Sequence, residues 1–93
     1  MIYEYNGNLI DGLYYFYAGW NGKCQYINDK INKLNSNYPD FPIVKVNTTK
    51  NQLLKKQFSV NKIPTFILLN NSKIIKRIDG NTDYYSLSQL IKK

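Results

Sequence analysis

The chain has 93 residues, 43% of them hydrophobic, and its 13 Lys and Arg against 6 Asp and Glu give a net charge of +7. This length and composition predict one domain, residues 1–93, with its own packed core, and exclude a disordered chain. A single cysteine, Cys24, excludes an intramolecular disulfide, and the absence of histidine excludes a Cys/His zinc site and histidine acid–base catalysis, so no metal or other cofactor is expected.

The sequence shows neither a membrane-spanning segment nor a secretory leader. No stretch reaches the roughly 20 apolar residues that a membrane-spanning helix needs, and the first residues lack the basic start and apolar run of a leader. We therefore expect a cytoplasmic protein in a reducing compartment, with no membrane partner. The positive charge attracts polyanions, but the lysines are spread along the chain, so a solvated basic surface is favoured over a nucleic-acid site.

The first predicted element is a short edge strand over residues 2–5, where apolar and polar residues alternate up to an Asn-Gly turn signal. Residues 13–18 form a nearly all-apolar run, typical of a central strand buried on both faces. From Gly22 apolar residues recur at intervals of three and four, which predicts a helix ending near residue 37. A strand over residues 43–46 follows.

The second half of the chain predicts a helix, a hairpin and a final helix. Thr48 or Thr49 can cap the first of these helices. Residues 66–69 and 73–79 are expected to form antiparallel strands joined by a turn at Asn70-Asn71. Thr82 or Asp83 can cap the last helix. The apolar residues expected to share one face are, in turn, Leu53, Leu54 and Phe58, then Ile74 and Ile78, then Leu87, Leu90 and Ile91.

Connection rules turn this order of elements into an architecture. A strand, a crossover helix and a second strand make a right-handed parallel unit, and the hairpin adds antiparallel strands to it. We therefore predict an α/β protein of three layers, with a mixed central sheet flanked by helices.

Two motifs resemble those of the thioredoxin family. Trp20-Asn21-Gly22-Lys23-Cys24 follows the central strand, and Ile63-Pro64-Thr65 precedes the strand at 66–69. Thioredoxins have Trp-Cys-Gly-Pro-Cys where a strand gives way to a helix, and a later Ile-Pro-Thr before a central strand. The resemblance covers residues 13–93 and implies a thioredoxin-like fold. Residues 1–12 are a shortened N-terminal strand region, in which only Asn6 to Gly12 are available for the helix that usually precedes the central strand. We therefore expect that helix to be missing and one sheet face to be more open than usual.

The resemblance also implies what has become of the family's redox chemistry. Asn21 takes the position of the nucleophilic cysteine and is interpreted as a helix cap, while Cys24 matches the second, resolving cysteine and Lys23 the active-site proline. Tyr15 takes the position of a buried carboxylate. Lys45 matches the family's buried lysine, and with that carboxylate replaced it is expected to face solvent or to pair elsewhere. The losses together imply that the dithiol cycle has been abandoned.

The binding groove of the family is retained in the sequence. Ile63-Pro64 resembles the family's cis-proline pair, whose backbone holds an extended substrate peptide, and Trp20 and Gly80 match residues that line the same groove. Two functions stay open. One is a redox-degenerate module that binds a protein or extended peptide. The other is a thiol–disulfide oxidoreductase or redox sensor that works through Cys24 alone, by a mixed disulfide or a glutathione adduct. A second copy of the chain, linked through Cys24, is a further candidate partner.

Overall fold

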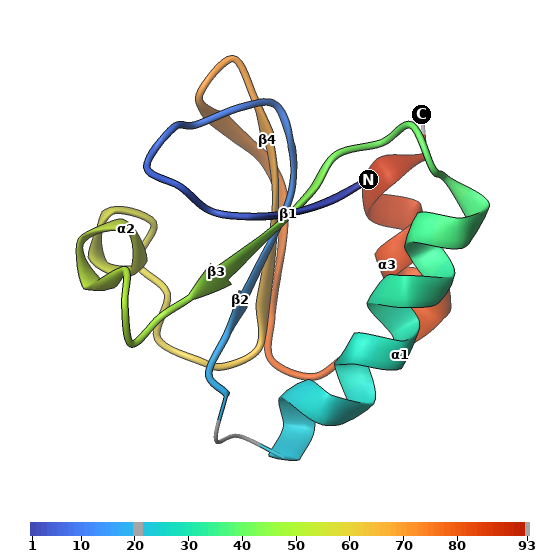
Figure 1. Cartoon of the computed structure of the whole chain (residues 1–93), viewed down its shortest axis with the longest axis horizontal. Coiled ribbons are helices and arrows are strands. Elements are labelled where there is room, and N and C mark those ends of the chain that lie inside the picture. The colour runs from blue at the N-terminus through green and yellow to red at the C-terminus, as the bar shows by residue number, and fades with distance from the viewer. Residues whose placement is uncertain (20–21, 93) are drawn as a thin grey trace.

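Strands and helices follow one another in the predicted order (Figure 1). The computed structural model describes residues 1–19 and 22–92, with side chains for 1–19 and 26–92. Within this part of the chain the elements are β1 (Ile2–Glu4), β2 (Gly12–Tyr17), α1 (Gly22–Asn37), β3 (Ile43–Asn47), α2 (Gln52–Gln57), β4 (Thr65–Asn70), β5 (Lys73–Asp79) and α3 (Tyr84–Ile91).

The five strands form one mixed sheet in the order β1-β3-β2-β4-β5. β3 pairs in parallel with both β1 and β2, whereas β4 pairs antiparallel with β2 and β5. The apolar run therefore becomes the central strand, β2, as predicted. Helices α1 and α3 cover one face of the sheet and α2 lies against the other, so the three-layer α/β architecture is confirmed (Figure 1).

The sheet face under α1 and α3 holds a stacked pair of aromatic rings. Tyr15 is fully buried and stacks on Phe66, with ring centroids 5.4 Å apart and planes 10° from parallel. Apolar residues of both helices pack around this pair: Ile27, Ile31, Leu34, Leu87 and Leu90. The ammonium of Lys30 donates to the carbonyl of Thr82 at 2.9 Å. That bond ties α1 to the loop that leads into α3.

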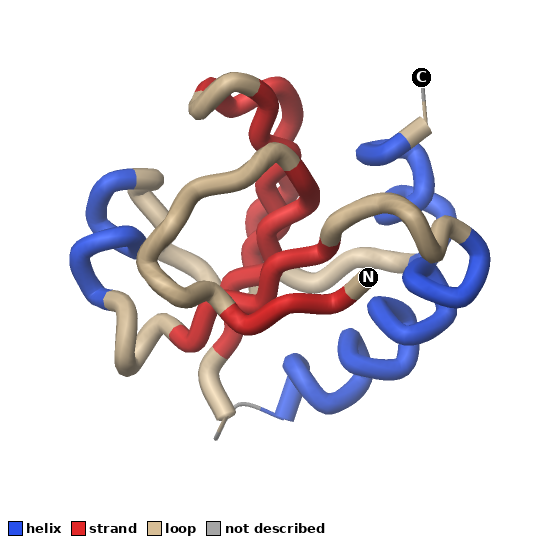
Figure 2. The backbone as a smooth tube through the Cα atoms, turned by 45° about the horizontal axis from the view of Figure 1, so that its top comes forward, coloured by secondary structure: helices blue, strands red, loops and turns tan. Residues whose placement is uncertain are grey.

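The opposite sheet face is closed, which corrects the expectation that it would be more open. Its sheet residues are at most 3% exposed: Tyr14, Phe16, Val44, Val46, Ile67 and Leu69. No helix lies between residues 1 and 19; instead the loop after β1 arches over this face beside α2 (Figure 2). Tyr5 and Leu9 of the loop pack on the apolar cluster. A loop thus covers the surface that a helix usually covers in the family.

Helix α2 begins later than predicted. Asn51 is its N-cap and makes no side-chain capping bond. The hydroxyl of Thr48 instead donates to the carbonyl of Tyr17 at 3.0 Å. Leu54 and Phe58 are buried, but Leu53 is 86% exposed, so the prediction of Leu53 on the apolar face is wrong. The helix has only six residues, and one turn and a half presents a single buried position, Leu54, to the sheet.

The β4–β5 hairpin is confirmed, with two differences. Its turn lies at Asn71 and Ser72, one residue later than predicted; both have positive φ, as tight hairpin turns require. A β-bulge shifts the register at Leu68/Leu69, so Leu69 pairs with Ile74 while Phe66 pairs with Ile78. The bulge reverses the alternation between these pairs. Ile74 follows Leu69 to the α2 face and Ile78 packs on the α1/α3 face, so they do not share a face.

The last helix follows its prediction closely. Asp83 is the N-cap of α3, and its carboxylate accepts a hydrogen bond from the Ser86 N–H at 2.7 Å. Leu87 and Leu90 are buried and Ile91 packs against the same cluster.

Candidate functional site

Four chain segments meet at one end of the sheet. The carboxyl ends of the parallel strands β2 and β3 lie at the same edge, and the N–H and hydroxyl of Thr48 both donate to the Tyr17 carbonyl, at 2.9 and 3.0 Å. Residues 18 and 19 lead from this edge toward α1. The loop before β4 and the loop after β5 reach the same edge, because both strands run antiparallel to β2 or to each other.

The loop before β4 is held to the loop after β5 by the backbone. The N–H of Gly80 donates to the carbonyl of Pro64 at 2.7 Å, and Pro64 is buried. The Ile63–Pro64 peptide bond is cis, and Gly80 has a φ of +94° that suits a glycine. On the other side of Pro64, the hydroxyl of Thr65 donates to the Lys62 carbonyl at 2.6 Å. The structure therefore brings together Ile63, Pro64 and Gly80, three of the residues that the sequence placed in a groove.

Ile63 differs from its neighbours in this loop. Its side chain is half-buried and packs against the clusters on both sheet faces, so it is anchored at the sheet edge. Its backbone N–H and C=O take part in none of the hydrogen bonds among the described residues, whereas the carbonyls of Lys62 and Pro64 and the N–H of Gly80 do. An anchored residue whose backbone N–H and C=O are unpaired among the described residues can hydrogen-bond an extended segment at this end of the sheet.

The first motif lies mainly outside the described residues. Trp20 and Asn21 are outside them altogether, and for Gly22, Lys23 and Cys24 only the backbone is described, as the first turn of α1. The assignments of Asn21 as a cap, of Cys24 as a thiol and of Trp20 as a groove wall stay predictions.

Tyr15 and Lys45 are clearly placed. Tyr15, which the resemblance aligns with the family's carboxylate, is fully buried and stacked on Phe66. Lys45 pairs elsewhere, as one of its two expected fates: its ammonium lies over the Tyr17 ring, 4.9 Å from the centroid. Lys45, Tyr17 and Glu4 form one cluster, since the Tyr17 hydroxyl donates to the Glu4 carboxylate at 3.3 Å. Sequence reasoning missed Tyr17 and Glu4 as members of it. The signal for Glu4 was its place on the edge strand, opposite Lys45.

The shifted pKa values among the described residues belong to groups away from this end of the sheet. Burial raises the pKa of the Tyr14 phenol, and the Ser86 N–H lowers the pKa of the Asp83 carboxyl. The described residues contain no group of three or more His, Cys, Asp or Glu that could hold a metal ion. Nor do they contain a helix that is long and apolar enough to cross a membrane.

A mixed five-stranded sheet with helices on both faces and a buried proline beside a glycine loop at the sheet edge defines a thioredoxin-like α/β protein. The family model for thioredoxin matches residues 6–93. The chain therefore belongs to the thioredoxin family.

Several proteins similar to this chain are named thioredoxins. The chain is 35% identical over 85 residues to thioredoxin of Chlamydia trachomatis, which covers 91% of this chain and 79% of that one. It is 34% identical over 80 residues to thioredoxin-T of Drosophila melanogaster, covering 84% of this chain but only half of that protein's length. A solved structure of thioredoxin-2, described as a component of the malaria parasite protein secretion machinery, superposes with a TM-score of 0.81 at 33% identity, over 95% of this chain and 89% of the other.

Proposed function

We propose that this protein binds extended segments of partner proteins along a groove formed by Ile63, Pro64 and Gly80, with Trp20 as its aromatic neighbour, and that it does so without a dithiol cycle. One observation carries the proposal: the Ile63 backbone, which takes part in no hydrogen bond among the described residues, stands beside the Gly80–Pro64 hydrogen bond of 2.7 Å. A peptide added there as a strand would gain main-chain hydrogen bonds that do not depend on its sequence. The expected partners are therefore unfolded or extended protein segments.

The cysteine content supports the second half of the proposal. A dithiol cycle needs one thiolate to attack a substrate disulfide and a second thiol to release the mixed disulfide. This chain has one cysteine, Cys24, so it cannot complete that cycle within one molecule. At the position where the family has its nucleophile, Asn21 offers an amide, which does not attack disulfides but is among the best helix N-caps.

One observation favours a second candidate, a monothiol redox protein. Cys24 is the third residue of α1, and a helix N-terminus lowers the pKa of a thiol. The Cys24 thiolate would attack a partner disulfide, forming a mixed disulfide and releasing one partner thiolate. A free thiol such as glutathione would then have to displace Cys24, because the chain holds no second thiol.

The two candidates are separated by binding to a polypeptide that has no thiols. Reduced and carboxymethylated α-lactalbumin is permanently unfolded, and fluorescence anisotropy of a labelled sample measures its affinity. The groove proposal expects saturable binding that is unchanged in Cys24→Ser. No binding to this probe, together with a disulfide-exchange activity that disappears in Cys24→Ser, would replace it by the monothiol candidate.

A pair of glycine variants tests the position of the groove. Gly80 and Gly7 both have positive φ, +94° and +102°, and a Cβ at either would meet nothing within 4 Å. Asn tolerates such backbone better than other residues. Gly80→Asn is expected to weaken probe binding about tenfold because its side chain stands beside Pro64, whereas Gly7→Asn, in the loop after β1, is expected to leave it unchanged. Equal affinities of the two variants would place the binding surface elsewhere.

A further inference from the structure

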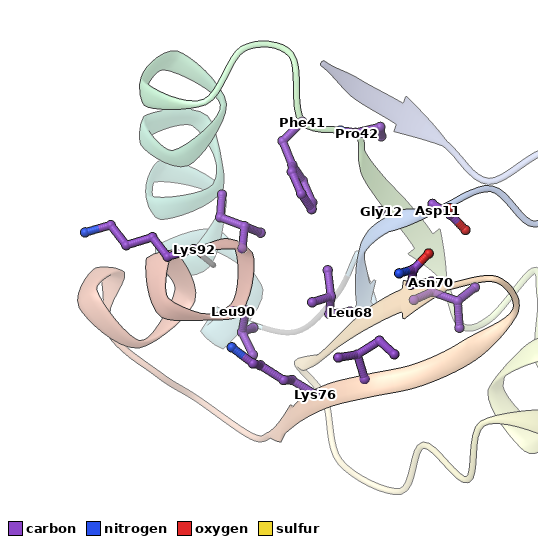
Figure 3. A pocket seen from close by; sticks show the side chains of 12 residues that line it. Asp11, Gly12, Phe41, Pro42, Leu68, Asn70, Lys76, Leu90 and Lys92 are labelled. Carbon is purple, nitrogen blue, oxygen red and sulfur yellow. The ribbon is translucent and has the colours of Figure 1, made fainter.

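A second concave site lies at the far end of the molecule from the groove. It is a cavity of about 530 Å³, lined by the start of β2, the loop before β3, parts of β4 and β5, and the end of α3 (Figure 3). Gly12, the first residue of β2, lines this cavity. The groove lies at the other end of the same strand, beyond its last residue, Tyr17. At about 3.3 Å per residue the two sites are about 17 Å apart along this strand. The cavity volume lies within the range of small-molecule sites.

The walls of the cavity are mainly apolar, and several of the apolar side chains are not buried by the fold. Phe41, Leu68 and Ile91 are half-buried, and Ile75 is 52% exposed. Phe41 points into the space between the end of α3 and the sheet (Figure 3). Partly exposed apolar side chains that converge on one concavity leave unburied area that a ligand can cover.

The β-bulge contributes to this arrangement. With Leu68 paired to Lys76 and Leu69 paired to Ile74, Ile75 is the extra residue of β5. Ile75 and Lys76 both line the cavity. Bulges commonly lie beside functional sites. This bulge lies at the cavity wall, where an apolar and a cationic residue follow one another.

The charged groups of the lining are unevenly placed. Asp11 and Asn70 lie on one rim and Lys76 lies on the other, next to α3, whereas the Lys92 side chain runs away from the cavity (Figure 3). The Asp11 carboxylate is engaged, since it accepts a hydrogen bond from the Asn71 N–H at 2.8 Å. The Lys76 ammonium makes one exposed bond of 3.2 Å to the Gln89 carbonyl and so retains further N–H donors. Lys76 also offsets the negative end of the α3 dipole.

We propose that this cavity binds a small amphiphilic anion, such as a medium-chain carboxylate. The alkyl chain would lie against Phe41, Leu68 and Ile75, and the head group would face Lys76. Apolar burial would supply most of the affinity, because this ammonium group is at the surface and a charge pair is weak there. The head group would set the orientation and the preference for an anion. The site is independent of the peptide groove and of Cys24.

Sodium decanoate is the probe, titrated into the isotopically labelled full chain and followed by amide chemical shifts. Saturable shifts are expected at residues 11–12, 41–42, 68–70, 75–76 and 90–92, and not at residues 62–65 or 80. Decanol and decyltrimethylammonium serve as neutral and cationic probes of the same length. The proposal expects decanoate to bind most tightly, by about threefold or more over decanol, with the difference shrinking as salt rises to about 500 mM. Equal affinity for the three probes, or shifts that do not saturate, would overturn it.

Neighbouring side chains give matched controls. Ile75→Ser is expected to weaken decanoate binding about tenfold, whereas Ile74→Ser, one residue away and 41% exposed on the other sheet face, is expected to leave it unchanged. Both side chains are exposed, so neither change empties the core. Lys76→Gln should lower decanoate affinity without lowering decanol affinity, and Lys56→Gln makes the same charge change on α2 as its control. An equal effect of Lys76→Gln and Lys56→Gln would contradict a head-group site.

Discussion

The Tyr14 phenol oxygen accepts a hydrogen bond from the backbone N–H of Ile10 at 2.9 Å and donates one to the carbonyl of the same residue at 2.8 Å. Tyr14 lies on the central strand and is fully buried, so this two-way contact fastens the loop after β1 to the middle of the sheet. The side chains of Tyr5 and Leu9 then cover the α2 face. One hydroxyl group thus fixes a loop where the family usually has a helix.

Removing that hydroxyl tests how far the loop depends on it. Tyr14→Phe is expected to lower the free energy of unfolding by about 1–3 kcal/mol, because it leaves the Ile10 N–H and C=O without their partner. Urea denaturation of the variant measures the loss. Tyr26→Phe, at an exposed position on α1, is the control and is expected to change the stability little. Equal stabilities of Tyr14→Phe and the wild type would mean that the loop is held by apolar packing alone.

At Gly12 there is no room for a larger side chain. A Cβ built on it would lie 2.6 Å from the Pro42 carbonyl oxygen, which also accepts the Leu13 N–H at 2.9 Å. Gly12→Ala is therefore expected to displace the start of β2 from Pro42 and to destabilise the fold by about 1–3 kcal/mol. Thermal unfolding followed by circular dichroism measures this. At Gly19 a Cβ would meet nothing within 4 Å, so Gly19→Ala should be close to neutral, and similar losses in both variants would contradict the steric argument.

Acid stability should depend on the cap of α3. The Ser86 N–H favours the ionised Asp83 carboxyl and lowers its pKa below the usual 3.8. A lowered folded-state pKa means that the stabilisation is fully present above pH 3.8 and is lost as the pH falls through the folded-state pKa. Asp83→Asn keeps a capping oxygen but does not titrate. The unfolding temperature of the wild type should therefore fall toward that of Asp83→Asn at acid pH, and parallel profiles would contradict this linkage.

The proposed loss of the dithiol cycle can be tested by adding a second thiol. Asn21→Cys would place a cysteine three residues before Cys24, at the position that the resemblance assigns to the family's nucleophile. It is expected to give measurable insulin disulfide reduction, which the wild type with one cysteine should lack. Asn21→Cys combined with Cys24→Ser is the control and should not turn over. A folded Asn21→Cys variant without activity would mean that more of the site than Asn21 has diverged.

The sequence predicted the order and type of the described elements because each carries a strong local signal. The run from Leu13 to Ala18 is apolar on both faces, and in α1 the apolar residues Ile27, Ile31 and Leu34 recur at helical spacing. Details that rest on tertiary contacts were not predictable in this way. The bulge that separates Ile74 from Ile78 has no local signature, and Leu53 looked like a core residue because a helix of six residues leaves the periodicity too short to decide.

The candidate site was predicted to a similar extent. A motif of three residues, Ile63-Pro64-Thr65, was enough to mark the sheet edge, because the fold brings Gly80 to it through one backbone hydrogen bond. The cluster of Glu4, Tyr17 and Lys45 was not predicted as a unit, since it depends on the parallel register of three strands. The closing of the α2 face was missed because a loop of mixed composition gives no sign of what it covers.

The β-bulge in β5 also affects the tendency of the molecule to aggregate at high concentration. β5 is an edge of the sheet, with one side of its backbone unpaired by any neighbouring strand among the described residues. A second chain that paired along it would lose register where Ile75 interrupts the strand, and would meet the charges of Lys73, Lys76 and Arg77 on the way. Irregular and charged edges of this kind discourage strands from adding to one another without limit. The irregular, charged edge at β5 therefore disfavours strand-by-strand aggregation of the molecule.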